Sequence, residues 1–135
     1  MAESGTYALL IEVERPKTIH VGALGEIPFD RGWYAYVGSA FGPGGLSRVD
    51  RHRSIAAGTH DVRHWHVDYL LGAEGTHLRD VITWPGRDIE CELAERVDGK
   101  FVDRFGASDC DCTAHLIGRT DRAVLERSLA EAGER

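Results

Sequence analysis

The chain has 135 residues, 42% of them hydrophobic and 28% charged, which is typical of one folded domain and unlike a disordered chain. Its formal net charge is −6, no apolar run is long enough to span a bilayer, and the first residues do not resemble a secretory leader. Three cysteines in such a chain argue against a disulfide framework, so we expect a single domain over residues 1–135 that has no membrane partner and works in the cytoplasm.

The first half of the chain predicts strands joined by Gly- and Pro-rich turns, followed by a helix. Strands are expected over residues 7–13, 18–23 and 33–39. The first of these alternates as a half-buried strand does, with Tyr7 and Leu9 on its apolar face. A glycine-rich segment, residues 42–45, then opens a helix that runs to about residue 57.

The second half predicts two helices among further strands. We expect strands over residues 64–71, 78–84 and 113–118, a helix over residues 88–97 that Asp88 caps, and a final helix capped by Thr120 or Asp121. The segment 64–71 would place His64, His66 and Asp68 on one face. The spacing of the strands favours antiparallel hairpins. The sequence therefore predicts an α+β fold, a small and mostly antiparallel sheet with helices packed on it.

The helix over residues 88–97 carries an acid in an unusual place. On a helical wheel Glu90 falls inside the apolar arc that includes Ile89 and Leu93, whereas Glu92 falls outside it. A carboxylate that faces a core needs a metal ion, a cation or several hydrogen bonds. The alternatives are a residue at the edge of the apolar arc that reaches water, and a structural ion pair with an arginine.

A basic stretch lies within this acidic protein. Residues 46–67 hold four arginines against two acids. Such a stretch is a candidate phosphate-binding surface. Its candidate nucleic-acid contacts are Arg48, Arg51, Arg53, Arg63, His64 and His66. The alternative is a solvated helix face with ordinary surface arginines, and for His64 and His66 a metal site or hydrogen bonds within the fold.

Three tyrosines, Tyr7, Tyr34 and Tyr36, lie on the expected strands on either side of a glycine-rich region. A phenol can orient or deprotonate water if a nearby cation lowers its pKa from about 10. The alternative is that they are half-buried core residues.

The order of these features resembles the GIY-YIG nuclease family. The motifs are Gly5-Thr6-Tyr7, Tyr36-Val37-Gly38, an arginine helix and a helical glutamate. Further segments are similar to the small stand-alone branch of Uri-type nucleases, namely residues 32–40, 44–46, 51–52, 64–70, 90–94 and 108–116. The similarity spans roughly residues 5–117.

The resemblance implies a metal-dependent endonuclease whose catalytic residues are Tyr7, Tyr36, Arg48, His52 and Glu90. It would hydrolyse nucleic-acid phosphodiester bonds, with DNA favoured over RNA, using one Mg²⁺ or Mn²⁺ ion held by Glu90. Arg48 would stabilise charge in the transition state, and a tyrosine would take a proton from the attacking water. His52 would assist either role.

The chain also departs from the family pattern. Its two motif tyrosines are 29 positions apart, which predicts an extra hairpin between them. The short spacing before Arg48 makes Arg51 a rival for the arginine role. The family often has an active-site asparagine and this chain has none, so Ser108, Asp109 or His115 would replace it, or activity is weak or absent.

A second candidate metal site consists of Cys91, Cys110, Cys112 and His115, which could bind Zn²⁺. The spacing is not that of a standard zinc finger, so reduced cysteines packed as small apolar groups are favoured over zinc. Two alternatives to the nuclease therefore stay open, a nucleic-acid-binding module of the same fold without efficient cleavage and a zinc-stabilised interaction domain. Since the net charge opposes strong nonspecific binding, a partner or a homodimer would complete the grip on nucleic acid.

Overall fold

Five strands form the central sheet in the parts of the chain that the computed structural model describes, residues 4–41, 45–58, 66–96, 100–101, 116–119 and 121–133. The strands are β1 (Gly5–Val13), β4 (Gly32–Ala40), β5 (Thr76–Pro85), β6 (Lys100–Phe101) and β7 (Leu116–Arg119). Their order across the sheet is β5-β1-β4-β7-β6, and every neighbouring pair is antiparallel. Strand β1 therefore has a hydrogen-bonded neighbour on each side.

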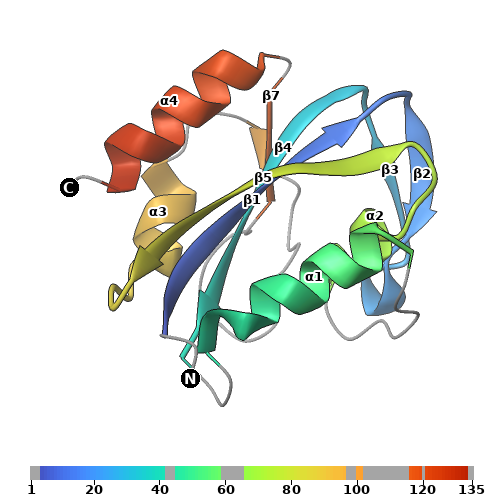
Figure 1. Cartoon of the computed structure of the whole chain (residues 1–135). Helices are drawn as coiled ribbons and strands as arrows, with labels where there is room; N and C mark the ends of the chain where they lie inside the picture. Colours follow the sequence, from blue (N-terminus) through green and yellow to red (C-terminus); the bar gives the residue numbers. More distant parts are fainter. Residues whose placement is uncertain are drawn as a thin grey trace.

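Helices cover both faces of this sheet (Figure 1). They are α1 (Arg48–Ala56), α2 (His66–Leu71), α3 (Glu90–Arg96) and α4 (Arg122–Gly133). Tyr7 and Leu9 of β1 belong to the core shared with α1 and α2, whereas Ala8 and Leu10 belong to the core shared with α3 and α4. The alternation expected along β1 is present, but the second face is buried by helices instead of facing water.

The expected α+β class, a mostly antiparallel sheet with helices packed on it, is confirmed. Within the described segments, no helix is long and apolar enough to cross a membrane.

The hairpin expected between the two tyrosine motifs is also present. It consists of β2 (Lys17–His20) and β3 (Glu26–Phe29), which pair antiparallel as a separate sheet around the short 3-10 turn Gly22–Leu24. Phe29 packs edge-on against Tyr34 of β4, with 5.8 Å between ring centroids. The insertion thus extends the core shared with α1 and α2.

The strand predicted over residues 64–71 is wrong, because residues 66–71 form α2. Helical spacing accounts for this result, since three apolar residues on one face of the helix are buried, namely Val67, Leu70 and Leu71. His66 and Asp68 consequently do not share one face as they would on a strand. Asp68 is fully buried and His66 is partly exposed.

The helix caps are only partly as predicted. Asp121 caps α4, because its side chain accepts a hydrogen bond from the Ala123 N–H (2.9 Å). Asp88 does not begin a helix, since α3 starts at Glu90 and the Ile89 carbonyl accepts the first helical hydrogen bond (2.7 Å).

Thr6 fastens the segment before α3 to β1. Its buried hydroxyl donates to the Arg87 carbonyl (2.7 Å) and accepts from the Ile89 N–H (3.1 Å). The second of these bonds reaches Ile89, one residue before Glu90. The two bonds therefore fix the start of α3 against the beginning of β1. Thr6 and Tyr7 are adjacent, so the same short segment of β1 positions both Glu90 and the first tyrosine.

We expect Thr6→Val to lower the free energy of unfolding by about 1–3 kcal/mol, because it leaves the Ile89 N–H without its acceptor in a nearly dry environment. Urea unfolding measures the difference. Thr18→Val on the exposed side of β2 is the matched control and should change stability by less than about 0.5 kcal/mol. Equal effects of the two substitutions would contradict the anchoring role of Thr6.

Candidate active site

Tyr7 and Tyr36 lie on the same face of the sheet, on the neighbouring strands β1 and β4. Their ring centroids are 6.4 Å apart. Gly38 pairs with Tyr7 across the strands, and a side chain at Gly38 would overlap the Tyr7 ring. The absence of a Cβ at this position is therefore what lets the Tyr7 ring lie flat across β4.

His52 completes this aromatic cluster from the buried side of α1. Its Nε2 lies 2.8 Å from the Tyr7 hydroxyl oxygen, within hydrogen-bond distance. The ring centroids of Tyr7 and Tyr36 lie 5.5 and 6.4 Å from that of His52. The structure thus brings together three of the predicted catalytic residues in the core between the sheet and α1.

Arg48 lies at the start of α1, which Figure 1 places beside the beginning of β1 and the end of β4. Its guanidinium donates to the Ser39 carbonyl (2.6 Å). Burial raises the pKa of Tyr7 well above its usual range, and Arg48 opposes this shift through its charge and a side-chain hydrogen bond. Arg48 is therefore the predicted arginine that acts on the Tyr7 hydroxyl.

Glu90 is partly exposed at the first position of α3. Burial is the main cause of the raised pKa of Tyr36, and the negative charge of Glu90 adds to the shift for both Tyr36 and Tyr7. In the same helix Leu93 is buried and Glu92 is exposed, as the helical wheel predicted. Glu90 lies on a helix on the other face of the sheet, yet its charge contributes to the raised pKa of both phenols.

Tyr34 is directed elsewhere. Its hydroxyl donates to the Asp30 carbonyl (2.8 Å). Burial raises its pKa to about 12, with a further contribution from the charge of Asp30. This tyrosine is consequently bound to the turn before β4 and not to His52.

Asp68 is a residue of this cluster that the sequence placed with His64 and His66, as a possible metal site, and did not connect with His52. Its fully buried carboxylate accepts a hydrogen bond from Arg51 (2.8 Å), and its Oδ1 lies 3.4 Å from His52 Nδ1. On a helical wheel of residues 66–71, Asp68 lies beside Leu71 at the edge of the buried apolar arc. No pattern in the sequence therefore marks it as fully buried.

The remaining basic candidates are less closely gathered. Arg51, the predicted rival of Arg48, is paired with Asp68, whereas the charge of Arg48 acts on the Tyr7 hydroxyl. Arg53 is exposed and lies 3.5 Å from Asp50. His66 begins α2, and Arg63 and His64 lie outside the described residues.

The second candidate metal site is not described. Cys110, Cys112 and His115, together with Ser108 and Asp109, lie outside the described residues, and Cys91 is placed only as part of the α3 backbone. Among the described residues, no group of three or more His, Cys, Asp or Glu could hold a metal ion.

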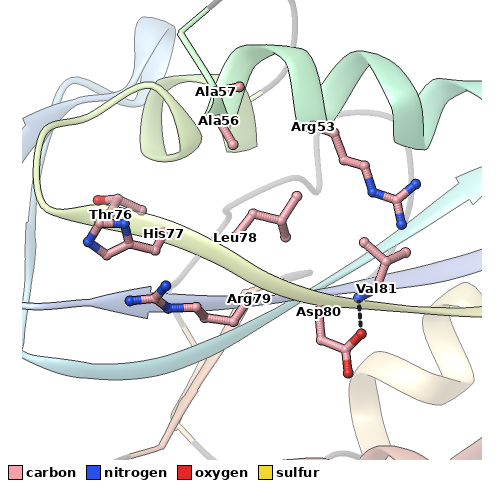
Figure 2. Close-up of a pocket in the computed structure, with 9 residues that line it drawn as sticks. All are labelled: Arg53, Ala56, Ala57, Thr76, His77, Leu78, Arg79, Asp80 and Val81. Carbon is pink, nitrogen blue, oxygen red and sulfur yellow. Dashed lines mark hydrogen bonds between the residues drawn. The ribbon is translucent and has the colours of Figure 1, made fainter.

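A groove of about 420 Å³ lies between α1 and the edge strand β5 (Figure 2), and its lining includes no residue of the tyrosine cluster. Arg53 reaches across it from α1 toward Val81. Around β5, Arg79 pairs with Glu12 (2.8 Å) and His77 with Glu14 (2.7 Å). These pairs offset the basic groups, so the groove does not form a strongly positive surface.

The two buried phenols predict a loss of stability in alkali. Because burial raises the pKa of Tyr7 and Tyr36 above the value of about 10 in an unfolded chain, the unfolded state loses these protons first. The free energy of unfolding should be insensitive to them below about pH 10 and fall above it, by at most about 1.4 kcal/mol per pH unit for each phenol. Urea unfolding at about pH 9 and pH 11 should therefore show a smaller loss for Tyr7→Phe or Tyr36→Phe than for the wild type. An unchanged loss would show that the phenols ionise normally in the folded protein.

Comparison with known proteins gives one family. Neither a curated protein nor a solved structure matches the chain. Residues 6–135 match the model of a domain of unknown function, DUF123, and this range includes both tyrosines, the helix of Arg48 and His52, and Glu90. The chain therefore belongs to the DUF123 family.

Proposed function

We propose that this protein is a divalent-metal-dependent endonuclease that hydrolyses nucleic-acid phosphodiester bonds. One observation supports this most strongly: the Tyr7 hydroxyl contacts His52 at 2.8 Å and is acted on by the opposite charges of Arg48 and Glu90. A phenol from β1, an imidazole and a guanidinium from α1 and a carboxylate from α3 supply a proton acceptor, a phosphate-binding cation and a metal ligand. DNA is favoured over RNA by the resemblance of the motifs to GIY-YIG nucleases.

Glu90 fits a hydrated hard cation. Mg²⁺ and Mn²⁺ prefer oxygen ligands, and Mg²⁺ commonly binds one or two carboxylates together with water and substrate phosphate. Glu90 supplies a partly exposed carboxylate, whereas no group of three metal-binding side chains is found among the described residues. When bound, the ion would stabilise negative charge on the phosphate.

Arg48 is suited to hold the scissile phosphate. Its guanidinium is partly exposed at the beginning of α1, and the Ser39 carbonyl orients it from β4. The planar guanidinium matches two phosphate oxygens, so it can stabilise the additional charge of a pentavalent transition state.

Tyr7 can take a proton from water only if another group accepts its own proton. Burial holds its proton more tightly than that of an ordinary phenol, so the resting hydroxyl is not a base. His52 Nε2 lies within hydrogen-bond distance and can accept the proton as Tyr7 takes one from the attacking water. Tyr36, whose ring packs beside both residues, would hold the rings of Tyr7 and His52 in position.

Further contacts with the nucleic acid backbone would come from exposed basic side chains of α1, such as Arg53. A net charge of −6 opposes strong association at physiological salt, so we infer that a homodimer or a protein partner extends the contact surface.

The proposal predicts that cleavage depends on Glu90 and Arg48. Either Glu90→Ala or Arg48→Ala should lower the rate of cleavage of labelled DNA in Mg²⁺ or Mn²⁺ by at least about 10²-fold, because each removes charge stabilisation at the phosphate. Chelation of the metal should abolish cleavage by the wild type. Single-stranded, duplex and branched DNA, with matched RNA, serve as substrates.

Glu92→Ala and Arg96→Ala are the matched controls, since both side chains are exposed on the same helix as Glu90. They should cleave at close to the wild-type rate. Activity lost in Glu92→Ala but kept in Glu90→Ala would refute the assignment of the metal ligand. If no substrate is cut but binding persists and weakens with salt, the protein is instead a nucleic-acid-binding module of this fold.

A further inference from the structure

Three buried side chains lie in a row, Tyr7 of β1, His52 of α1 and Asp68 of α2. The Tyr7 hydroxyl lies 2.8 Å from His52 Nε2, and His52 Nδ1 lies 3.4 Å from Asp68 Oδ1. His52 and Asp68 are fully buried, and Tyr7 is almost so. Polar groups that are enclosed in this way are strongly coupled, because no bulk water screens them.

The Asp68 carboxylate on one side of His52 and the Tyr7 hydroxyl on the other decide which ring nitrogen carries the proton. A carboxylate can only accept a hydrogen bond, so a proton on Nδ1 is attracted to Asp68, whereas a lone pair on Nδ1 would be repelled by it. With the proton on Nδ1, the Nε2 lone pair faces the Tyr7 hydroxyl and accepts from it. The opposite tautomer would turn Nε2–H toward the phenol and leave Nδ1 opposed to a negative oxygen.

We infer that Asp68 is a positioning residue that holds His52 with its proton on Nδ1, so that Nε2 is ready to accept the proton of Tyr7. The role of this proton acceptor in hydrolysis rests on the proposed nuclease function, but the tautomer itself does not. Asp68 touches neither the phosphate nor the attacking water in this scheme and acts only through His52.

Arg51 makes a buried carboxylate at this place tolerable. Its NH2 and NH1 atoms lie 2.8 and 3.4 Å from the two oxygens of Asp68, and the Arg51 side chain keeps 22% of its surface exposed. The ion pair compensates the charge of Asp68 and fixes the orientation of its carboxylate toward α1. Oδ1, the oxygen that Arg51 contacts at the longer distance, is also the one that lies 3.4 Å from His52 Nδ1.

The proton transfers balance without any additional reactant. The Tyr7 O–H proton passes to His52 Nε2, and the phenolate oxygen takes a proton from the attacking water, whose oxygen forms the new P–O bond. The P–O bond to the leaving oxygen breaks, and that oxygen keeps the bonding electron pair until solvent water protonates it. His52 becomes an imidazolium between Tyr7 and Asp68, and its positive charge strengthens the 3.4 Å contact.

The competing explanation is that Asp68 is only one half of an ion pair that joins α1 to α2. The position of the ring proton separates the two explanations, because an ion pair with Arg51 alone places no demand on the tautomer of His52. In the described residues His52 Nδ1 has no hydrogen bond of good geometry, so the carboxylate is the polar group that decides this question.

Nitrogen NMR of the full-length chain with labelled histidine rings provides the test. Seven histidines contribute signals, and a His52→Gln sample identifies those of His52. At neutral pH we expect a protonated Nδ1 and an unprotonated Nε2 that shows a hydrogen-bonded shift. A protonated Nε2 with an unprotonated Nδ1 would overturn the inference. This readout needs no substrate and no variant of Asp68.

The Asp68→Asn variant adds a functional readout, with Asp50→Asn on the exposed side of α1 as the matched control. An amide can donate to Nδ1, so we expect the His52 proton to move to Nε2 in Asp68→Asn and to stay on Nδ1 in Asp50→Asn. In cleavage assays kcat should fall by about 10²–10⁴-fold in Asp68→Asn. KM should change less than about threefold.

The nuclease function and the positioning role of Asp68 can be refuted separately. If the wild-type tautomer is as expected but no nucleic acid is cut, the nuclease function is refuted and the assignment of Asp68 stands. If nucleic acid is cut but the tautomer is reversed, or if Asp68→Asn cuts at the wild-type rate, the positioning role is refuted and the nuclease function stands.

Discussion

The hydrogen bond between Tyr7 and His52 joins two polar groups that the fold has removed from water, and much of the local architecture follows from it. A phenol and an imidazole that are buried without partners would each destabilise the folded state by a few kcal/mol, about 1–3 for a neutral group. Their contact at 2.8 Å satisfies the phenol and the Nε2 atom of the imidazole, and it joins the buried side of α1 to β1. Asp68 and Arg51 extend this pairing to α2, so that three elements share one polar cluster inside an otherwise apolar core.

The alternation of β1 connects this cluster with the opposite face of the sheet. Thr6 and Tyr7 are neighbours in the chain and point in opposite directions, one toward the start of α3 and the other toward α1. The distance between Glu90 and the phenols is thus set by a strand, which is rigid, and not by a flexible loop. This arrangement suits a site whose charged groups must keep their positions while a phosphate is bound.

Several arginines of the described residues are paired with acids. The arginines of α1 illustrate this, since Arg51 binds the buried Asp68 and Arg53 lies next to Asp50. The exposed pairs on β1 and β5 contribute little to stability, whereas the partly buried Arg51–Asp68 pair compensates a charge that has no access to water. A count of arginines in the sequence therefore overstates the positive charge that has no acidic partner, and Arg48 is distinguished because its charge and a side-chain hydrogen bond act on Tyr7.

The long spacing of the motif tyrosines, compared with the family that the chain resembles, indicated the hairpin between them. The sequence by itself determined the fold class and the unequal environments of Glu90 and Glu92. These features depend on local periodicity and turn residues, which neighbouring positions in the chain record directly. Only the tertiary structure decided that Arg48 acts on Tyr7 and that Asp68 faces His52. Those outcomes depend on contacts between α1, α2 and β1. Asp68 is 16 residues from His52 in the sequence and 61 residues from Tyr7. Contacts of that kind arise from packing around a shared core, and no pattern within a single segment encodes them.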